Sequence, residues 1–307
     1  MTLAELIAQA AARLAAAHQA GQLAFGHGTT NAHDEAAWLV LWKLALPLDC
    51  DLGSEGARSV STAEARDALA LIDERIATRK PAAYLTREAW LQGVPFYVDE
   101  RTIVPRSFIA ELIADADGQG TLDAWLGEDT SAVLDLCTGN GSLAVLAALA
   151  WPEVRVDGAD ISDEALAVAR INIDKHGLQE RVQLLKSDGL AQVARSYDLI
   201  LCNPPYVNQQ SMTALPAEYR AEPELALAGG ADGMDFIRRL LRDAPARMSA
   251  HAVLVLEIGN EREHYEAAFP ALAARTVWLD TSAGADQVLL LTREALDAAA
   301  PGADTPR

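Results

Sequence analysis

The sequence predicts an α/β protein in which a small helical domain precedes a mostly parallel, doubly wound sheet. Half of the 307 residues are hydrophobic, which suffices for a sizeable core, and this length suggests about two domains. From residue 131 onward, apolar strand-like runs alternate with helical segments, as they do in parallel sheets covered by helices on both faces. Residues 1–86 show helical patterns only, so we expect a separate helical domain there.

The N-terminal helices are expected from periodicity and capping residues. Residues 1–20 carry leucines and an isoleucine among alanines at helical spacing. A second helix over 34–47 opens with an aspartate that can cap it and ends at a proline. Ser61 precedes Glu64 at the spacing of a capping box, so a third helix should run from there to about Arg79.

A β-hairpin is expected to link the two domains. Residues 88–104 alternate in strand fashion around a Gly-Val-Pro turn. A helix should then run from about residue 108 to 116, and residues 118–130 should form a loop with one helical turn. The predicted organisation is therefore a helical domain at 1–86, a hairpin linker at 87–105, an α/β domain at 106–293 and a disordered tail at 294–307.

The α/β domain shows repeated strand–helix units. Strands are expected at 132–136, 155–159, 182–186, 198–202, 252–258, 276–279 and 288–292. Helices are expected at 143–150, 164–176, 234–248 and 261–274, with a short helix near Leu190. The last two strands follow each other without a helix, so we expect an antiparallel pair at the sheet edge.

Charge and cysteine content bound the function. Asp and Glu total 44 against 25 Lys and Arg, a net charge of −19, which disfavours general binding to nucleic acid. This acidity suits a basic protein partner, or else it serves only solubility. The three cysteines, Cys50, Cys137 and Cys202, are odd in number and lack zinc spacing, which predicts neither a disulfide framework nor a metal site. His27 and His33 stand alone and are interpreted as loop or capping residues.

Membrane association is not expected. The longest uninterrupted apolar run, 143–151, is far shorter than the ~20 residues of a membrane helix. The Ala-rich N-terminus lacks the basic start of a signal peptide and carries Glu5, so it is better interpreted as an amphipathic helix. These features predict a soluble, cytoplasmic protein.

A glycine-rich loop joins the first strand of the sheet to its helix. Gly139, Gly141 and Ala144 satisfy the G-x-G-x-x-A pattern, in which backbone approaches a ligand over a helix N-terminus. Asp160 ends the second strand about 20 residues on, where a carboxylate can bind ribose hydroxyls. Asp188 ends the third strand and could accept from an adenine amino group. Nicotinamide enzymes share this loop, and the two acids could instead cap helices.

The segment after the fourth strand reads Asn203-Pro204-Pro205-Tyr206. The Asn203 side chain and the Pro204 carbonyl offer two acceptors, which the prolines could hold rigidly. Such a pair can bind both hydrogens of a planar NH2 group, and Tyr206 could stack on that group. Because this strand end lies on the same sheet edge as the glycine loop, the motif indicates an enzyme that alkylates an amide or exocyclic amine. The alternative is a simple Pro-Pro turn.

These motifs, combined with a helical N-terminal domain, resemble the protein-(glutamine-N5) methyltransferase family within the class I S-adenosylmethionine-dependent methyltransferases. Further segments resemble the branch that acts on large-subunit ribosomal protein three, namely 26–31, 34–36, 104–107, 111–113, 135–139 and 218–227. Ser107 and Cys137 depart from the branch that acts on release factors, which usually has Pro and Gly there. Phe108 departs from the ribosomal branch, where a second Pro is common.

The resemblance implies a Rossmann-like, seven-stranded, mostly parallel sheet and S-adenosyl-L-methionine as cofactor. The implied catalytic residues are Asn203, Pro204, Pro205 and Tyr206. The implied cofactor-binding residues are Asp135, Cys137, Gly139, Asn140, Gly141, Asp160, Asp188 and Asn203. The expected partner is a basic ribosomal protein, selected by the helical domain and the loop at 207–232.

Other functions remain possible at this point. Release factors could be the substrate, and an adenine-N6 methyltransferase would use the same amine grip, although the negative charge argues against nucleic acid. A nicotinamide oxidoreductase would leave the segment 203–206 unexplained. A non-catalytic ribosome-assembly factor would not need the intact glycine loop.

Overall fold

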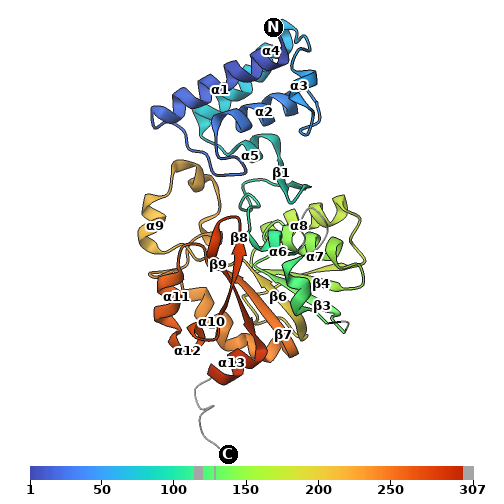
Figure 1. The fold of residues 1–307 in the computed structure, drawn as a ribbon, viewed down its shortest axis with the longest axis vertical. Coiled ribbons are helices and arrows are strands. Elements are labelled where there is room, and N and C mark those ends of the chain that lie inside the picture. The colour runs from blue at the N-terminus through green and yellow to red at the C-terminus, as the bar shows by residue number, and fades with distance from the viewer. Residues whose placement is uncertain (114–119, 128, 300–307) are drawn as a thin grey trace, which may run out of the picture.

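The computed structural model describes residues 1–113, 120–127 and 129–299. Helices near the N-terminus form the upper part of the molecule in Figure 1, and the sheet with its covering helices forms the lower part. Within the described ranges, no helix is both long and apolar enough to cross a bilayer.

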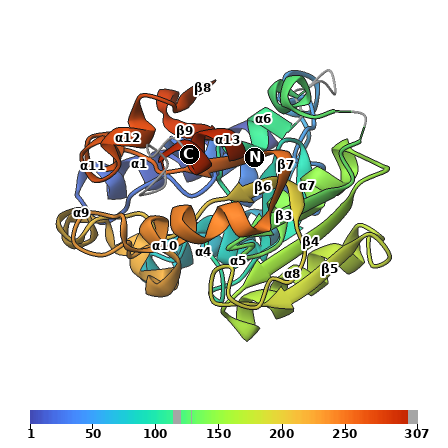
Figure 2. The same cartoon turned by 90° about the horizontal axis from the view of Figure 1, so that it is seen from below.

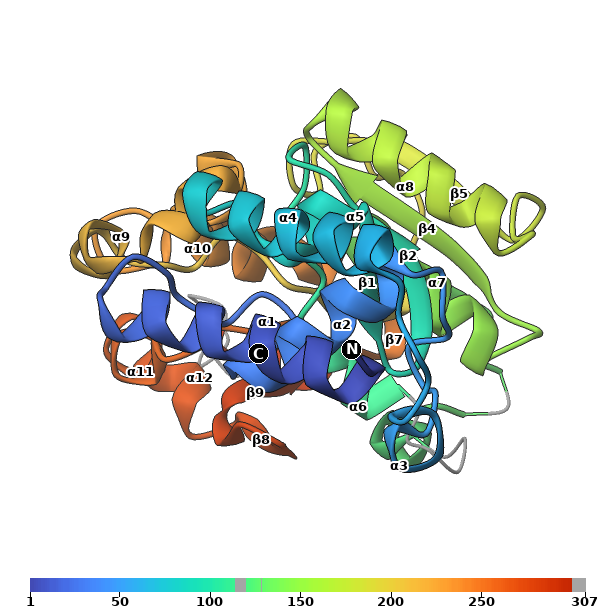
Figure 3. The ribbon, with the colours of Figure 1, turned by 90° about the horizontal axis from the view of Figure 1, so that it is seen from above.

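The N-terminal region is a small helical bundle (Figures 1 and 3). Its elements are α1 (Leu3–Gln19), α2 (Ala32–Lys43), α3 (Leu52–Glu55), α4 (Thr62–Thr78) and α5 (Ala82–Thr86). Ser61 and Glu64 form the predicted capping box on α4. The prediction for α2 was wrong at its start: Asn31 is the N-cap and accepts from the backbone N–H of Asp34, because a side chain caps the residue three positions on.

The predicted hairpin is present as β1 (Glu88–Leu91) and β2 (Val94–Tyr97), which pair antiparallel. It is followed by α6 (Ile109–Ile113) and the 3-10 helix η1 (Thr121–Trp125). Residues 114–116 of the helix expected over 108–116 lie outside the described residues.

The main sheet has seven strands in the order β5-β4-β3-β6-β7-β9-β8. The strands are β3 (Ala132–Leu136), β4 (Arg155–Asp160), β5 (Val182–Lys186), β6 (Tyr197–Cys202), β7 (Met248–Glu257), β8 (Val277–Thr281) and β9 (Gly284–Thr292). Strands β5 to β7 are parallel, and β9 pairs antiparallel with β7 and β8, which confirms the predicted fold class. Figure 2 shows β4, β3, β6 and β7 as successive members of the sheet.

The strand order reverses between β3 and β6. After β3 the chain adds β4 and β5 on one side, and then β6 returns to the other side of β3. Leu136 pairs with Cys202, so the segments that follow β3 and β6 leave the sheet side by side. Ligands of open α/β sheets bind at such a switch point, and both predicted motifs begin there.

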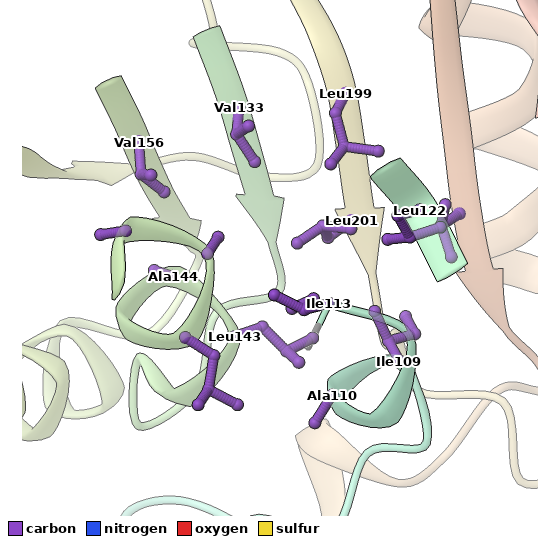
Figure 4. Packing of buried hydrophobic residues seen from close by; sticks show 14 of the residues in the cluster. Ile109, Ala110, Ile113, Leu122, Val133, Leu143, Ala144, Val156, Leu199 and Leu201 are labelled. Carbon is purple, nitrogen blue, oxygen red and sulfur yellow. The ribbon is translucent and has the colours of Figure 1, made fainter. Parts of the chain in front are cut away.

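Helices cover both faces of the sheet. They are α7 (Ser142–Ala150), α8 (Asp163–Lys175), α10 (Asp235–Asp243), α11 (Arg262–Ala268), α12 (Pro270–Ala273) and α13 (Arg293–Ala299). On one face α6 and α7 pack on β3, β4 and β6 through Ile109, Leu143, Val133 and Leu199 (Figure 4). On the other face α10 and α13 pack through residues such as Leu240 and Leu296. Burial on both faces explains why these strands are continuous apolar runs.

Several predicted elements differ in the structure. The helix expected over 234–248 ends at Asp243, and a 3-10 turn, η4 (Ala244–Arg247), leads into β7. The helix expected over 261–274 is split at Phe269, because Pro270 has no N–H to continue it and starts α12 instead. Residues near Leu190 form turns and not a helix.

The C-terminal tail and the segment at 207–232 contain structure that the sequence analysis did not predict. Residues 293–299 form α13, packed against the sheet, in place of the start of a disordered tail. Residues 300–307 lie outside the described residues. The segment expected to be a loop contains α9 (Gln209–Ala214), η2 (Ala217–Ala221) and η3 (Glu224–Ala226).

Candidate active site

Asp135 shapes the glycine loop from the end of β3. Its buried Oδ2 accepts from Thr138 Oγ1 at 2.5 Å and from the backbone N–H of Ala144 at 2.9 Å. Burial raises the pKa of Asp135 to about 7, against the opposing effect of these two hydrogen bonds. Oδ1 has no hydrogen-bond partner among the described residues. The site therefore holds a buried carboxylate oxygen that can still accept a hydrogen bond.

The loop backbone takes three left-handed conformations in five residues. Gly139 and Gly141 have φ of +55° and +80°, as the motif predicts. A Cβ at Gly141 would also lie 3.0 Å from Cβ of Ala169 on α8, so a larger residue would push that helix away. Cys137 adopts φ of +63° although it is not glycine, which is a strained backbone position. The loop thus turns tightly over the N-terminus of α7.

Asn140 connects the loop to its surroundings. Its carbonyl accepts from Asn172 Nδ2 at 2.8 Å, and Asn172 also accepts from the backbone N–H of Tyr97 in the hairpin. Asn140 is itself buried, and its Nδ2 has no partner within the described part of the chain. A free buried donor and the free acceptor on Asp135 both fit a ligand that carries polar groups into this loop.

Asp160 and Asp188 end neighbouring strands but differ in environment. Asp160 accepts from the N–H groups of Gly139 and Ser162, each at 2.9 Å, and burial raises its pKa. Ser162, not Asp160, is the N-cap of α8. Asp188 is half exposed and forms an ion pair with Arg239 at 3.0 Å. Neither acid caps a helix, so that alternative is wrong for both.

Ile161 follows Asp160 directly and is 45% exposed. Sequence reasoning did not select it. An apolar side chain exposed beside the Asp160 carboxylate offers a surface for a planar ring, and its position after the acid was the available signal.

Asn203 and Pro204 follow β6 and line a cavity of about 470 Å³. The Asn203 side chain is half-buried and makes no hydrogen bond with any other described residue. Its oxygen is therefore available to an NH2 group that enters the cavity. Pro205 is also half-buried, while Pro204 is buried.

Three glycines hold Tyr206 in place. A Cβ at Gly229 would lie 2.7 Å from Tyr206 Cα, and a Cβ at Gly259 would lie 2.5 Å from ring atom Cε2. Gly233 approaches the Tyr206 carbonyl just as closely. Real Cβ atoms do not tolerate such distances, so these positions require glycine. The ring is thus fixed at the cavity wall.

Glu257 anchors the Tyr206 hydroxyl. It lies buried at the end of β7, where Oε1 accepts from Tyr206 Oη at 3.2 Å. Oε2 accepts from Ser107 Oγ at 2.6 Å and from the backbone N–H of Phe108 at 2.9 Å. Burial raises the pKa of Glu257, and the hydrogen bonds from Ser107 and Tyr206 oppose the rise. Burial and the adjacent carboxylate also raise the pKa of Tyr206, so its hydroxyl stays protonated.

The cavity walls come from segments that are far apart in the sequence, although the lining does not include the glycine loop, Asp160 or Asp188. Besides the residues after β6, the lining includes Gly26, Ile103, Arg106, Phe108, Leu215, Tyr219 and Gln287. Sequence reasoning expected the helical domain and the loop at 207–232 to select the substrate, but it gave none of these residues a role of its own. His27, interpreted as a loop residue, is buried, and its ring packs on Tyr219 with centroids 4.3 Å apart. Among the described residues, no cluster of His, Cys, Asp and Glu could hold a metal ion.

Comparisons with known proteins relate this chain to methyltransferases. The family model described as Methyltransferase small domain matches residues 118–219. A protein of Bordetella pertussis named ribosomal protein uL3 glutamine methyltransferase is 53% identical, with 96% of each chain covered. A protein of the same name from Burkholderia pseudomallei is 50% identical, with 97% of each chain covered.

Among solved structures, the hMettl16 catalytic domain in complex with MAT2A 3'UTR hairpin 6 has a TM-score of 0.52 at 14% identity, covering 76% of this chain and 81% of that one. At that identity the likeness concerns the fold alone. The sequence identities of 53% and 50% over nearly the whole chain show the family. This protein belongs to the family of ribosomal protein uL3 glutamine methyltransferases, which are S-adenosylmethionine-dependent enzymes of the class I methyltransferase fold.

Proposed function

We propose that this enzyme methylates the side-chain N5 of a glutamine in ribosomal protein uL3. The observation that carries the proposal is that Asn203 and Pro204, which can offer two acceptors, line a cavity and follow the strand that pairs with the one leading into the glycine loop. A carboxamide has two N–H hydrogens, and two acceptors can bind both. The names of the relatives support uL3 as the substrate.

Catalysis depends on positioning in this proposal. The lone pair of a carboxamide nitrogen is delocalised into its carbonyl, so the nitrogen is a poor nucleophile. Asn203 Oδ1 and the Pro204 carbonyl each accept one N–H hydrogen and fix the plane of the amide. Orientation of this kind contributes ~7–11 kcal/mol at best. Tyr206, held by Glu257 and Gly259, packs on the amide plane and excludes water.

The cofactor residues are proposed from the same edge of the sheet. Gly139 and Gly141 allow close approach to the loop, Asp160 binds ribose hydroxyls and Asp188 accepts from the adenine amino group. The unpartnered atoms of Asp135 and Asn140 fit polar groups of the cofactor. When bound, S-adenosylmethionine supplies an electrophilic methyl group.

Substrate selection is proposed for the helical region 1–86 and the segment 207–232. Both contribute to the cavity wall, through Gly26 and through Leu215 and Tyr219. The net charge of −19 complements a basic ribosomal protein in the cytoplasm and should speed encounter. The association rate should therefore fall as salt is raised, and a rate indifferent to salt would contradict this part.

The decisive experiment offers the purified enzyme and labelled S-adenosylmethionine three substrates: uL3, a peptide-chain release factor, and adenine-containing DNA or RNA. We expect label in uL3 only, and tandem mass spectrometry should place one added methyl group on a glutamine side chain. Label in the release factor alone would move the enzyme to the other branch. Label in nucleic acid would overturn the assignment to a protein substrate.

A further inference from the structure

The segment η2 and the residue that follows it carry two buried glutamates, whose partners lie in different parts of the chain. Glu218 faces the N-terminal region: its Oε1 accepts from the backbone N–H of Ala24 at 2.9 Å and from Arg79 Nε at 3.0 Å. Its Oε2 accepts from Arg79 Nη2 at 2.7 Å. Only 1% of the Glu218 side chain is exposed. A buried carboxylate with this many donors fixes its own position and that of its neighbours.

Glu222, directly after η2, faces the linker. It accepts from the backbone N–H of Val104 at 2.9 Å and from both terminal nitrogens of Arg106, at 2.6 and 2.7 Å. Hydrogen bonds therefore hold the segment between the two glutamates at both ends, to the helical region on one side and to the linker on the other. This arrangement orders residues 218–222 without help from a long helix.

Tyr219 lies between these two glutamates and lines the same cavity as Asn203. Its ring packs on His27, and the Arg106 guanidinium lies 5.3 Å from the ring centroid. Gly26, with φ of +128°, leaves room for the hydroxyl, since a Cβ there would lie 3.4 Å from Tyr219 Oη. Tyr219 Oη makes no hydrogen bond with another described residue, so it is free for a substrate.

Arg106 adds a second free donor. Its terminal nitrogens bind Glu222 and the Val104 carbonyl, while Nε has no partner among the residues that the structure describes. Arg106 also lines the cavity. A volume of about 470 Å³ is in the range that holds a drug-sized ligand, so the residues on either side of a target glutamine can enter too.

We propose that Tyr219 is a substrate-positioning residue, which packs against the polypeptide flanking the target glutamine and, with Arg106 Nε, offers donors to its backbone carbonyls. This inference rests on the proposed function and extends it from the amide to the chain that carries it. Tyrosine suits this role because it offers a large rigid face and a polar tip at a small cost in side-chain entropy.

The test is steady-state kinetics with uL3 as the varied substrate. Tyr219→Ala should raise KM for uL3 at least ~10-fold and change kcat less, because the contact binds flanking chain and not the reacting nitrogen. Tyr219→Phe, which keeps the ring, should raise KM only about threefold. Arg155→Ala is the control, since Arg155 is exposed at the amino end of β4, away from the cavity and from both segments proposed to select the substrate. Calorimetric affinity for S-adenosylmethionine should be unchanged in all three.

A short uL3 peptide centred on the modified glutamine distinguishes positioning within the cavity from docking of uL3 at another surface of the enzyme. The Tyr219→Ala effect on KM should persist with this peptide, because the contact lies in the cavity. Wild-type KM in Tyr219→Ala would overturn the role, and so would a loss of kcat and melting temperature without a change in KM. A wild-type enzyme inactive on uL3 would overturn the proposed function first, and this role with it.

Discussion

Glu222 and Arg106 face each other through two parallel hydrogen bonds, from Nη1 to Oε1 at 2.6 Å and from Nη2 to Oε2 at 2.7 Å. Burial alone would raise the pKa of Glu222, but contact with His27 and the pair with Arg106 lower it from 4.5 to about 2. His27 Nε2 lies 3.7 Å from Oε2, beyond hydrogen-bond reach, so we take the Arg106 pair as the larger cause. The pair thus stabilises the fold in its ionised form.

The first prediction concerns Glu222→Gln and acid stability. A pKa lower in the folded than in the unfolded protein adds stability above pH 5, which is lost as the pH falls toward 2. The fall from 4.5 to about 2 corresponds to about 3 kcal/mol. Glu222→Gln should therefore be about 3 kcal/mol less stable than wild type at pH 7. The difference should shrink as the pH falls, because protonated Glu222 resembles glutamine.

Urea unfolding of both proteins at several pH values between 2 and 7 measures this difference. Glu224→Gln is the control, since Glu224 is exposed on the adjoining turn and should unfold like wild type at every pH. A Glu222→Gln deficit of the same size at pH 7 and pH 3 would show that the ion pair is not its source.

The second prediction concerns the two acceptors proposed to bind the substrate amide. Asn203→Ala removes one of two acceptors and should lower kcat about 10²–10³-fold, as the loss of one preorganised polar group does in other enzymes. Affinity for S-adenosylmethionine, measured by calorimetry, should persist. Asn203→Asp keeps an acceptor oxygen in the same place and should retain more activity than the alanine variant. Near-normal kcat in Asn203→Ala would contradict the positioning account.

The third prediction uses two glycines with similar backbones. Gly259 and Gly177 both have positive φ, +53° and +67°, so alanine at either position costs about 1 kcal/mol of stability. Only at Gly259 does the new Cβ meet a side chain, 2.5 Å from Tyr206 Cε2, whereas nothing lies within 4 Å at Gly177. Gly259→Ala should displace the Tyr206 ring and lower kcat at least ~10-fold, while Gly177→Ala should keep wild-type activity.

Melting temperatures and single-turnover rates of the two variants distinguish the effect of backbone strain from the effect of displacing the Tyr206 ring. Similar melting temperatures with unequal rates are the expected result. Equal rates would mean that Tyr206 does not need its present position, and would remove it from the mechanism.

The sequence predicted best the features that a short segment of residues determines, such as strand bounds and the placement of motifs. Strands β3 and β5 have the predicted bounds, because each is an apolar run between turn residues. The glycine loop and the segment after β6 were placed on one edge, because parallel strands carry their carboxyl ends there. The helix expected over 234–248 was predicted too long, because helical periodicity continues through Ala244–Arg247, where a proline forces a 3-10 turn.

The cavity wall was beyond sequence reasoning for a physical reason. Glu222 meets Arg106 across 116 residues, and Glu218 meets Arg79 across 139. The resemblance singled out the segment 218–227 that contains both glutamates, but nothing local indicates which residues they would contact. The role proposed for Tyr219 depends on the tertiary contacts of Glu218 and Glu222, which place it at the cavity wall.

The last prediction ranks the two acids of the cofactor site. Asp160 is mostly buried and accepts from the Gly139 N–H, so Asp160→Ala should remove the proposed ribose contact and also loosen the glycine loop. Charged hydrogen bonds of this kind contribute about 1.5–3 kcal/mol, so affinity for S-adenosylmethionine should fall at least ~10-fold. Asp188 is half exposed and paired with Arg239, and Asp188→Ala should cost less than about fivefold.

Asp163→Ala controls for charge alone, since Asp163 is an exposed carboxylate near the end of β4 whose partner is Lys186. Its affinity for S-adenosylmethionine should match wild type. Equal losses in Asp160→Ala and Asp188→Ala would contradict the ranking, because they would mean that Asp188 leaves Arg239 and binds the adenine amino group as strongly as Asp160 binds the ribose.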